Sequence, residues 1–491
     1  MNTLKRTLAL VATLAMSATA LASCGSDDSS DSKAATTGAA ATEGGNATEG
    51  NSEAGNSSEP ATDAPSNTAT AKPNSLDLGA VTLGTGGSQF TVVAWDGNDA
   101  PALLELWEAN GGDASKANFK NMSCKGEEAP ANLDNLFLAG QDIDVYFAEA
   151  DWALKFINDD QKAAPLEALG FTEDNFTDTF AYTNEIGRAT KGANEGKMVG
   201  ASWQSCPGGF AYNAELAEKY LGVKTPEEMQ EKVADWDKFV AAATEIAEKS
   251  DHKVALADSL GGMWQVFAAN RKSAWTKGGV LVVDSSCKTF ADYAKTLWDN
   301  GGVTRNEQWS NEWVPAGKDG ACMGYFASTW GLGSFVKDAS SNSAGKWKLI
   351  QGPDPYFWGG TWMVVNPKTD NAEEAQKFIY TAVVNPESMK SYSKSKPEYV
   401  NSVSVMNEVV AAGDVNEKIK ANFGGQNYFE PLHANAQKID LKGLITPYDS
   451  SIKSAFLTAV TENYCKNGDD WDKTVEAFKE EVNKKNPSGL N

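Results

Sequence analysis

The sequence predicts an α/β protein with two lobes, each a mostly parallel sheet flanked by helices. Short β-branched runs alternate with segments of helical periodicity, which is typical of parallel sheets covered by helices. The Trp, Phe and Tyr residues lie between residues 89 and 491. Roughly 400 residues exceed the size at which one hydrophobic core stops growing, so two lobes are expected.

The first elements alternate in the predicted way. Residues 90–95 form a β-branched run that ends in turn residues, and residues 101–109 carry apolar positions at helical spacing. Further strands are expected at residues 117–122 and 143–147, the second after a helix-like segment at 133–138. Ligands of parallel sheets bind at the carboxyl ends of strands. This rule places Trp95, Asp96 and the segment from Glu149 to Trp152 at a cleft edge.

Helices dominate the later half of the sequence. Thr225, Pro226 and Glu228 form a capping box with proline at the first helical position, and apolar residues follow at helical spacing to Ile246. One helix is therefore expected here, with Trp236 in the core. Further helices are predicted over residues 371–379 and around 471–478.

The N-terminus has the layout of an export signal. Lys5 and Arg6 precede an apolar stretch over residues 8–22, too short for a confident membrane span, and small residues follow. Leu21-Ala22-Ser23-Cys24 resembles the bacterial lipobox, which implies a signal peptide at 1–23 and lipid attachment at Cys24. The alternative is an ordinary cleaved signal with an incidental cysteine. Residues 24–88 are polar and acidic, which predicts a disordered linker.

Charge, cysteine and histidine counts exclude several classes of chemistry. The net charge of −23 argues against nucleic acid and anionic lipid as partners. With His252 and His433 the only histidines and no C-x-x-C motif, we expect no metal, cofactor or catalytic histidine. His252 is expected in an exposed loop. One or two disulfides remain open, without a pairing, among Cys124, Cys206, Cys287, Cys322 and Cys465.

Several short motifs follow one another behind the lipobox-like segment. They are Ala94-Trp95-Asp96-Gly97, Asp142-Ile143-Asp144-Val145-Tyr146, Gly196-Lys197-Met198-Val199-Gly200, Phe210-Ala211-Tyr212-Asn213, Met323-Gly324-Tyr325 with Trp330-Gly331, and Trp358-Gly359-Gly360-Thr361-Trp362. In this order they resemble the maltose- and oligosaccharide-binding (family 1) group of extracellular solute-binding proteins. Ala201-Ser202-Trp203 replaces the group's usual proline, so the shape of that loop is not predicted.

The resemblance implies a type II periplasmic-binding-protein-like clamp over residues 89–491. Lobe 1 would comprise residues 89–207 and 358–395, and lobe 2 residues 208–357 and 396–491. The chain would cross between lobes near 205–212, 350–360 and 390–400. The implied function is capture of an oligosaccharide, at the extracellular face of the cell membrane, for the permease subunits of an ABC importer. We expect a monomer without enzymatic activity.

Carbohydrate sites combine aromatic platforms with carboxylates, amides and arginine. The chain has 15 Trp residues, several of them in polar, loop-like contexts. Replacing Trp330 by Ala is expected to weaken binding at least tenfold. The candidate ligand-binding residues are Trp95, Asp96, Glu149, Asp151, Trp152, Trp203, Gln204, Trp264, Arg271, Trp330, Trp358, Gly359, Gly360 and Trp362.

Three alternatives remain open from the sequence. An extracellular glycoside hydrolase needs two carboxylates roughly 5–10 Å apart. The same fold with a polyamine, peptide or metal complex as ligand needs a compact aromatic cage with carboxylates. A Ca²⁺ site at Asp469-Asp470 or over Asp96 to Asp99 lacks the alternating pattern of a calcium loop, which favours solvated turns or helix caps.

Overall fold

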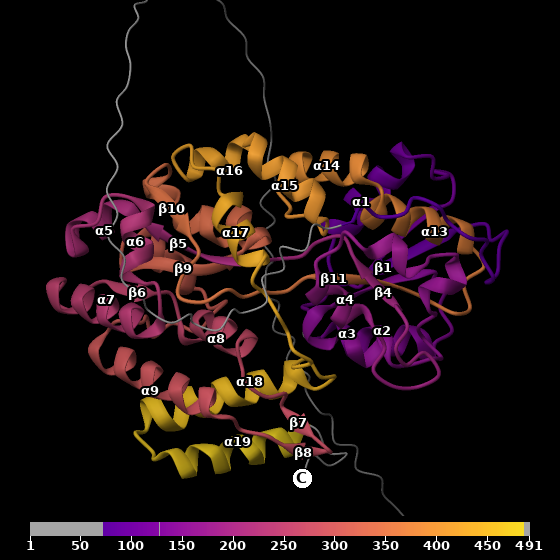
Figure 1. Ribbon diagram of the computed structural model, residues 1–491. Coiled ribbons are helices and arrows are strands. Elements are labelled where there is room, and N and C mark those ends of the chain that lie inside the picture. Colours follow the sequence, from indigo (N-terminus) through magenta and orange to yellow (C-terminus); the bar gives the residue numbers. More distant parts are fainter. Residues whose placement is uncertain (1–71, 127, 486–491) are drawn as a thin grey trace, which may run out of the picture. The chain divides into compact units, whose positions relative to one another are not determined.

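The computed structural model describes residues 72–126 and 128–485. The predicted signal peptide at 1–23, the lipidation site at Cys24 and the linker up to residue 71 lie outside the described residues. Two separate sheets carry the fold (Figure 1).

The first sheet has five strands in the order β2-β1-β3-β11-β4. They are β1 (Phe90–Ala94), β2 (Ala117–Asn121), β3 (Val145–Glu149), β4 (Gly200–Ser202) and β11 (Thr361–Val365). β1 pairs in parallel with β2 and β3, whereas β11 is antiparallel to both of its neighbours. Four of the five strands therefore run in one direction.

The second sheet has the order β10-β5-β9-β6 and, like the first, one strand that runs opposite to the others. Its strands are β5 (Gly208–Asn213), β6 (Ala255–Ala257), β9 (Cys322–Ser328) and β10 (Trp347–Ile350). Here β5 is the reversed strand, antiparallel to β10 and β9. Both reversed strands, β5 and β11, are the ones that the chain enters directly from the other sheet. The predicted α/β class with mostly parallel sheets is confirmed, with one reversed strand in each.

The chain passes between the sheets along neighbouring segments. Residues 203–207 lead from β4 to β5, and residues 351–360 lead from β10 to β11. Isolated bridges join Pro207 to Phe357 and Gln204 to Val400, so a third segment around Val400 lies beside the other two. This arrangement brings three crossover segments together.

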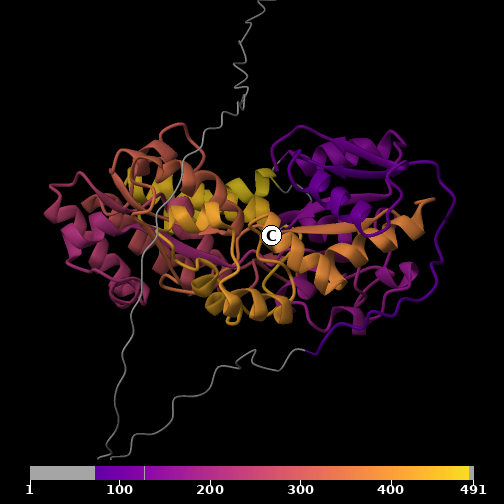
Figure 2. The ribbon, with the colours of Figure 1, turned by 90° about the horizontal axis from the view of Figure 1, so that it is seen from above.

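Helices cover both sheets (Figures 1 and 2). Both views place the orange α13 and α14 beside the indigo N-terminal elements, and α1 packs against β1 and α13. The helices discussed below are α1 (Asp99–Ala109), α2 (Ala129–Leu138), α3 (Ala150–Ile157), α4 (Ala181–Gly187), α6 (Pro226–Lys232), α7 (Trp236–Lys249), α8 (Leu260–Ala269), α9 (Ser285–Asn300), α10 (Trp313–Lys318), α11 (Thr329–Gly331), α13 (Ala372–Ile379), α14 (Pro386–Ser395), α15 (Val403–Ala412), α17 (Phe429–Ala436), α18 (Asp449–Ala459) and α19 (Trp471–Lys485).

The single helix expected after Thr225 is two helices, so that prediction is wrong. The capping box of Thr225 and Glu228 starts α6 as expected. The helix stops at Lys232, and the side chain of Asp235 accepts a hydrogen bond from the backbone N–H of Lys238 to start α7. Asp235 is a strong N-cap residue, and its local hydrogen bond competes with continuation of the helix. Trp236 is buried in the core, as predicted.

Residues 72–88, predicted as the end of a disordered linker, are ordered against the first sheet's helices. The amide of Gly79 donates to the carbonyl of Gly170 at 2.7 Å, and that of Thr82 donates to Ala168 at 2.8 Å. Three apolar side chains, Leu78, Val81 and Leu83, pack against the core. These widely spaced residues gave too weak a pattern in the sequence to predict the contact.

The five cysteines that the structure describes are all free thiols, so no disulfide forms among them. His252 is exposed in a turn, as expected. No helix in the described ranges is long and apolar enough to cross a membrane.

Candidate functional site

An aromatic cluster lies where the second sheet meets the crossover segments. We define it as Trp309, Trp330, Trp358 and Phe335. Trp330 follows the end of β9, and Trp358 belongs to the crossover at residues 351–360. The ring centroids of Trp330 and Trp358 are 5.0 Å apart and the planes are nearly perpendicular, at 71°. Both indoles are partly exposed, so each keeps apolar surface available to a ligand.

Glycines shape the backbone beside this cluster. Gly359 and Gly360 have φ values of +76° and +99°, in the region that side chains disfavour. A Cβ atom at Gly359 would lie 3.1 Å from Nε1 of Trp330. That Nε1 donates a hydrogen bond of 3.0 Å to the carbonyl of Trp358. Gly359 therefore allows the crossover to approach Trp330 closely, and the hydrogen bond fixes the Trp330 ring.

Buried carboxyl groups lie next to the cluster. Glu398, from the third crossover segment, is 7% exposed and accepts hydrogen bonds from the Thr329 hydroxyl at 2.8 Å and the Tyr399 amide at 3.0 Å. Burial, and then the negative charge of Asp99, raise the pKa of Glu398 to about 8. Burial, and then the charge of Asp96, likewise raise the pKa of Asp99 to about 6. At neutral pH Glu398 is therefore mostly a neutral carboxylic acid, able to donate a hydrogen bond.

A second group of predicted residues gathers at the ends of β1 and β3. Trp95 and Trp152 meet edge to face, with centroids 5.8 Å apart. Glu149 caps α3 by accepting a 3.0 Å hydrogen bond from the Asp151 amide. Burial, and then the charge of Asp151, raise the pKa of Glu149, whereas Lys453 lowers it. Trp152 is buried, so within this group Trp95, Glu149 and Asp151 retain exposed surface.

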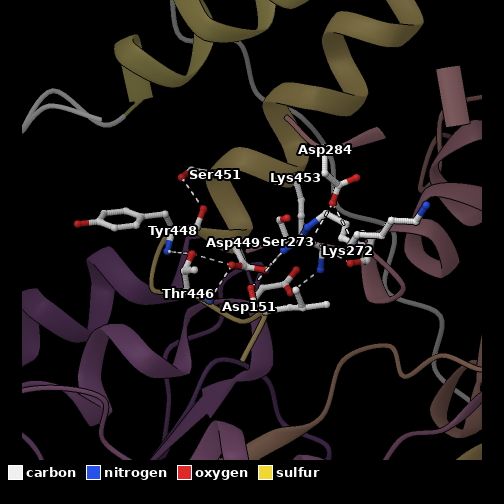
Figure 3. A network of polar contacts seen from close by, with 12 residues as sticks. Asp151, Lys272, Ser273, Asp284, Thr446, Tyr448, Asp449, Ser451 and Lys453 are labelled. Atoms are coloured by element: carbon white, nitrogen blue, oxygen red, sulfur yellow. Dashed lines mark hydrogen bonds and ion pairs between the residues drawn. The ribbon is translucent and has the colours of Figure 1, made fainter. Parts of the chain in front are cut away.

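An ion pair joins α3 to α18 beside this group. The Nζ of Lys453 lies 2.6 Å from Oδ1 of Asp151, and both side chains are less than one-third exposed. Figure 3 shows Asp151 from the indigo α3 facing Asp449 and Lys453 of the yellow α18. Because α3 packs against β3 and β11 while α18 packs against α8, the ion pair connects elements of the two sheets.

Arg271 serves a buried structural network instead of an open cleft in this conformation. It is 4% exposed, lies 3.3 Å from Asp449 and donates to the Ala268 carbonyl. Its guanidinium stacks 4.3 Å from the ring centroid of Trp275. The same region buries Trp264, which lies in α8 and not in the loop-like context expected, and whose Nε1 donates to the Lys453 carbonyl.

Three other predicted residues lie inside the protein. Trp203 is fully buried against Phe147, with ring centroids 4.9 Å apart. Gln204 is buried and accepts a hydrogen bond from the Cys206 thiol. Trp362 lies in β11 and donates to the Thr183 carbonyl at 3.0 Å. Asp96 caps the turn before α1 by accepting from the Asn98 amide.

The structure adds Trp309, Glu398 and Lys453 to the predicted set. Trp309 lies between two polar residues, Gln308 and Ser310. The polar, loop-like context that selected the other candidate Trp residues would therefore have selected Trp309 as well. Glu398 and Lys453 carry no such local signal, because their roles arise from partners far away in sequence. The structure thus assembles the aromatic cluster and the Glu149 group, and leaves Trp203, Trp264, Arg271 and Trp362 in packed surroundings.

Two surface hollows lie away from these groups. One, of about 590 Å³, is lined by residues of α9 and α19 that include Lys288 and Trp471. The other, of about 420 Å³, surrounds Glu185 and Arg188 at the end of α4. Among residues 72–126 and 128–485, no three His, Cys, Asp or Glu side chains are grouped to hold a metal ion.

The comparisons with known proteins agree with this architecture. A family model described as bacterial extracellular solute-binding protein matches residues 125–424. A search of curated protein sequences finds no significant match.

Solved structures share the fold. An extracellular solute-binding protein of family 1 is 18% identical with a TM-score of 0.69, covering 81% of this chain and 99% of its own. The galacto-N-biose/lacto-N-biose I-binding protein of an ABC transporter from Bifidobacterium longum is 17% identical with a TM-score of 0.62, covering 82% and 97%. A binding protein associated with an ABC transporter from B. animalis subsp. lactis, solved with β-1,6-galactobiose, is 21% identical with a TM-score of 0.61, covering 82% and 98%.

Proposed function

Since the chain belongs to the family of bacterial extracellular solute-binding proteins, we propose that it captures an oligosaccharide and delivers it to an ABC importer. The observation that carries this proposal is the aromatic cluster, in which Trp330 and Trp358 present partly exposed faces at a nearly perpendicular angle. Sugar rings have flat C–H faces that pack on indoles, and adjacent rings of an oligosaccharide offer several such faces. Two of the similar structures are complexes with lacto-N-biose and with β-1,6-galactobiose.

Polar groups around the cluster suit sugar hydroxyls. Glu398 offers a neutral carboxyl group, and Asp99 and Asp96 offer acceptors at the start of α1. Trp95, Glu149 and Asp151 extend the lining at the carboxyl ends of β1 and β3. A hydroxyl both donates and accepts, so a mixture of protonated and ionised carboxyl groups matches it well.

The mechanism that we propose is closure around the ligand. Two lobes, bounded as predicted from the sequence at residues 89–207 with 358–395 and 208–357 with 396–491, would bend about the three crossover segments. Closure would bury the sugar and present a surface that the permease recognises. Lipid attachment at Cys24 would hold the protein at the outer face of the membrane. No covalent step is involved, so the ligand should be released uncleaved.

A cationic ligand is the second candidate, favoured by one observation. The negative charge of Asp99 raises the pKa of Glu398, so a cation bound near both groups would relieve that repulsion. An ammonium group could also lie against the face of Trp330 or Trp358. Polyamines and basic peptides therefore belong in any ligand screen.

A thermal-shift screen of the purified protein tests the proposal. The panel comprises lacto-N-biose, β-1,6-galactobiose, acarbose, linear oligosaccharides of two to six rings, polyamines and basic peptides. A ligand that binds only the folded state raises the melting temperature by mass action. A shift with one glycan series, recovered uncleaved, supports oligosaccharide capture. A shift with amines or peptides alone would replace the sugar by a cationic ligand, and cleavage of the glycan would indicate a hydrolase.

A further inference from the structure

Trp309 combines two unusual properties. Its side chain is 60% exposed, and its backbone φ is +71°. A positive φ in a bulky residue is strained, persists only where the surroundings impose it, and is typical of active sites and ligand clamps. The residue belongs to the irregular segment between Val303 and α10. Strain and exposure together indicate a role beyond core packing.

The inner side of the Trp309 ring is held by a fixed aromatic wall. Its centroid lies 4.8 Å from that of Trp313 and 5.7 Å from that of Phe335, both in edge-to-face contact. Trp313 is itself anchored, because its Nε1 donates a 2.8 Å hydrogen bond to the buried carboxylate of Asp258. The outer surface of the indole has no such cover.

The residues on either side of Trp309 leave polar atoms unsatisfied. Nε2 of Gln308 and Oγ of Ser310 are buried and have no hydrogen-bond partner within the part of the chain that the structure describes. A buried polar atom without a partner costs free energy, and native proteins keep few of them. The segment that carries Trp309 therefore keeps hydrogen-bonding capacity that its neighbours within the described residues do not use.

The distance between the Trp309 and Trp330 rings is too small for a sugar ring to lie between them. The two rings are nearly parallel, at 18°, with centroids 6.0 Å apart. The gap between the ring planes can be no larger than this distance. A sugar ring held between two indoles needs roughly 3.5–4.0 Å on each side, and therefore a gap of roughly 7–8 Å. Trp309 thus covers Trp330 too closely for a ring to enter without a shift of roughly 1–2 Å.

On the basis of the proposed function, we infer that Trp309 is a gate and clamp for the ligand. In the conformation described here it covers Trp330, and it moves outward on binding to hold one sugar ring against Trp330. The perpendicular Trp358 then faces the next ring, so the preferred substrates are oligosaccharides of two or more rings, and monosaccharides bind poorly.

Calorimetry on four proteins tests this inference. The probes are two: the glycan of the proposed panel that gives the largest thermal shift, and the monosaccharide of which that glycan is built. The proteins are the wild type, Trp309→Phe, Trp309→Ala and the control Trp471→Ala, which removes a partly exposed Trp from α19. We expect Trp309→Ala to weaken glycan binding about tenfold or more, Trp309→Phe to stay within about threefold, and Trp471→Ala to match the wild type. Glycan binding should also shift the tryptophan emission of the wild type to the blue, and less so in Trp309→Phe.

The outcomes separate this inference from the proposed function. Unchanged or tighter binding by Trp309→Ala would overturn the clamp while leaving oligosaccharide capture intact. Absence of glycan binding by the wild type would overturn both. Should Trp309→Ala fail to fold, Trp309→Gly takes its place, because glycine tolerates the positive φ and should melt about 1–4 °C higher than the alanine variant. Where both variants fold, equal melting temperatures would contradict the strain on which the clamp depends.

Discussion

Trp330 is the residue whose loss should affect binding most directly. Its ring is fixed by the hydrogen bond from Nε1 to the Trp358 carbonyl, and it meets three other aromatic rings of the cluster. Trp330→Ala removes the platform and should weaken glycan binding at least tenfold, or about 1.4 kcal/mol. Calorimetry measures the change, with Trp298→Ala in α9 as a control. Wild-type affinity in a folded Trp330→Ala protein would remove this residue from the site.

Glu398 should make the stability of the protein depend on pH. Its pKa is about 8 in the folded protein against a usual value of 4.5, so the folded state holds the proton more strongly than the unfolded state. The stability contributed by Glu398 is therefore complete below about pH 4.5 and is lost as pH rises through about 8. Glu398→Gln keeps the shape and never ionises. We expect the difference in melting temperature, Glu398→Gln minus wild type, to be about 2–4 °C larger at pH 9 than at pH 5.

The matched control for Glu398 is the exposed Glu430 in α17. Glu430→Gln, which changes an exposed side chain outside the candidate site, should show the same pH dependence of the melting temperature as the wild type. A pH-independent difference between Glu398→Gln and the wild type would show that Glu398 is charged in the folded protein.

The exposure of single side chains in the candidate site was predictable where their sequence context was local. Trp330 and Trp358 stand in polar, glycine-rich surroundings, which predicted positions outside a packed core. Both indoles are partly exposed, and their contact with a ligand stays a prediction. Trp264 stands after two glycines as well, but Ser259 caps a helix there and turns the indole into the core. Glu398 acquires its character from Asp99 and Thr329, which are distant in sequence, so no local pattern could reveal it.

At the scale of elements, the ion pair between α3 and α18 should be strongly coupled. Lys453 and Asp151 are 2.6 Å apart with side chains 15% and 29% exposed. Partial burial weakens solvent screening, so a double-mutant cycle with Asp151→Asn and Lys453→Met should give a coupling free energy of about 1–2 kcal/mol. Denaturant unfolding of the four proteins measures it.

The exposed pair of Lys390 in α14 and Glu408 in α15 provides the comparison. Its atoms lie at a similar distance, 2.8 Å, but the side chains are 45% and 66% exposed. Solvent and salt screen such a pair, so its cycle should give less than about 0.5 kcal/mol. Equal coupling energies for the two pairs would show that burial does not strengthen the α3–α18 contact.

Elements were predicted well where periodicity was strong and poorly where a single polar residue decided the boundary. The strands at β1, β2 and β3 and the helices α1, α13 and α19 fall close to their expected ranges. Asp235 ended the expected long helix because its side chain caps a new one. Residues 72–88 pack on the first sheet through only a few apolar side chains, too sparse a signal against a polar background.

At the scale of the whole molecule, the reversed strands explain how the two sheets are connected. β5 and β11 each enter a sheet from the other one, and their direction is opposite to that of their neighbours. The sequence predicted two lobes from length and alternation, and the motif order predicted the crossovers. It could not predict strand order, because pairing between β3 and β11 depends on residues more than 200 positions apart.

The three crossover segments should let the molecule close on its ligand. They are short and adjacent, and one contains Gly359 and Gly360, whose positive φ values allow backbone conformations closed to other residues. Small-angle X-ray scattering should therefore give a smaller radius of gyration with saturating glycan than without it. Trp330→Ala, at a glycan concentration that saturates only the wild type, should keep the larger value. An unchanged radius of gyration in the saturated wild type would mean that the two lobes are already closed before the ligand binds. Closure could then not be the change that the permease recognises, and the lobes would have to open to release the ligand.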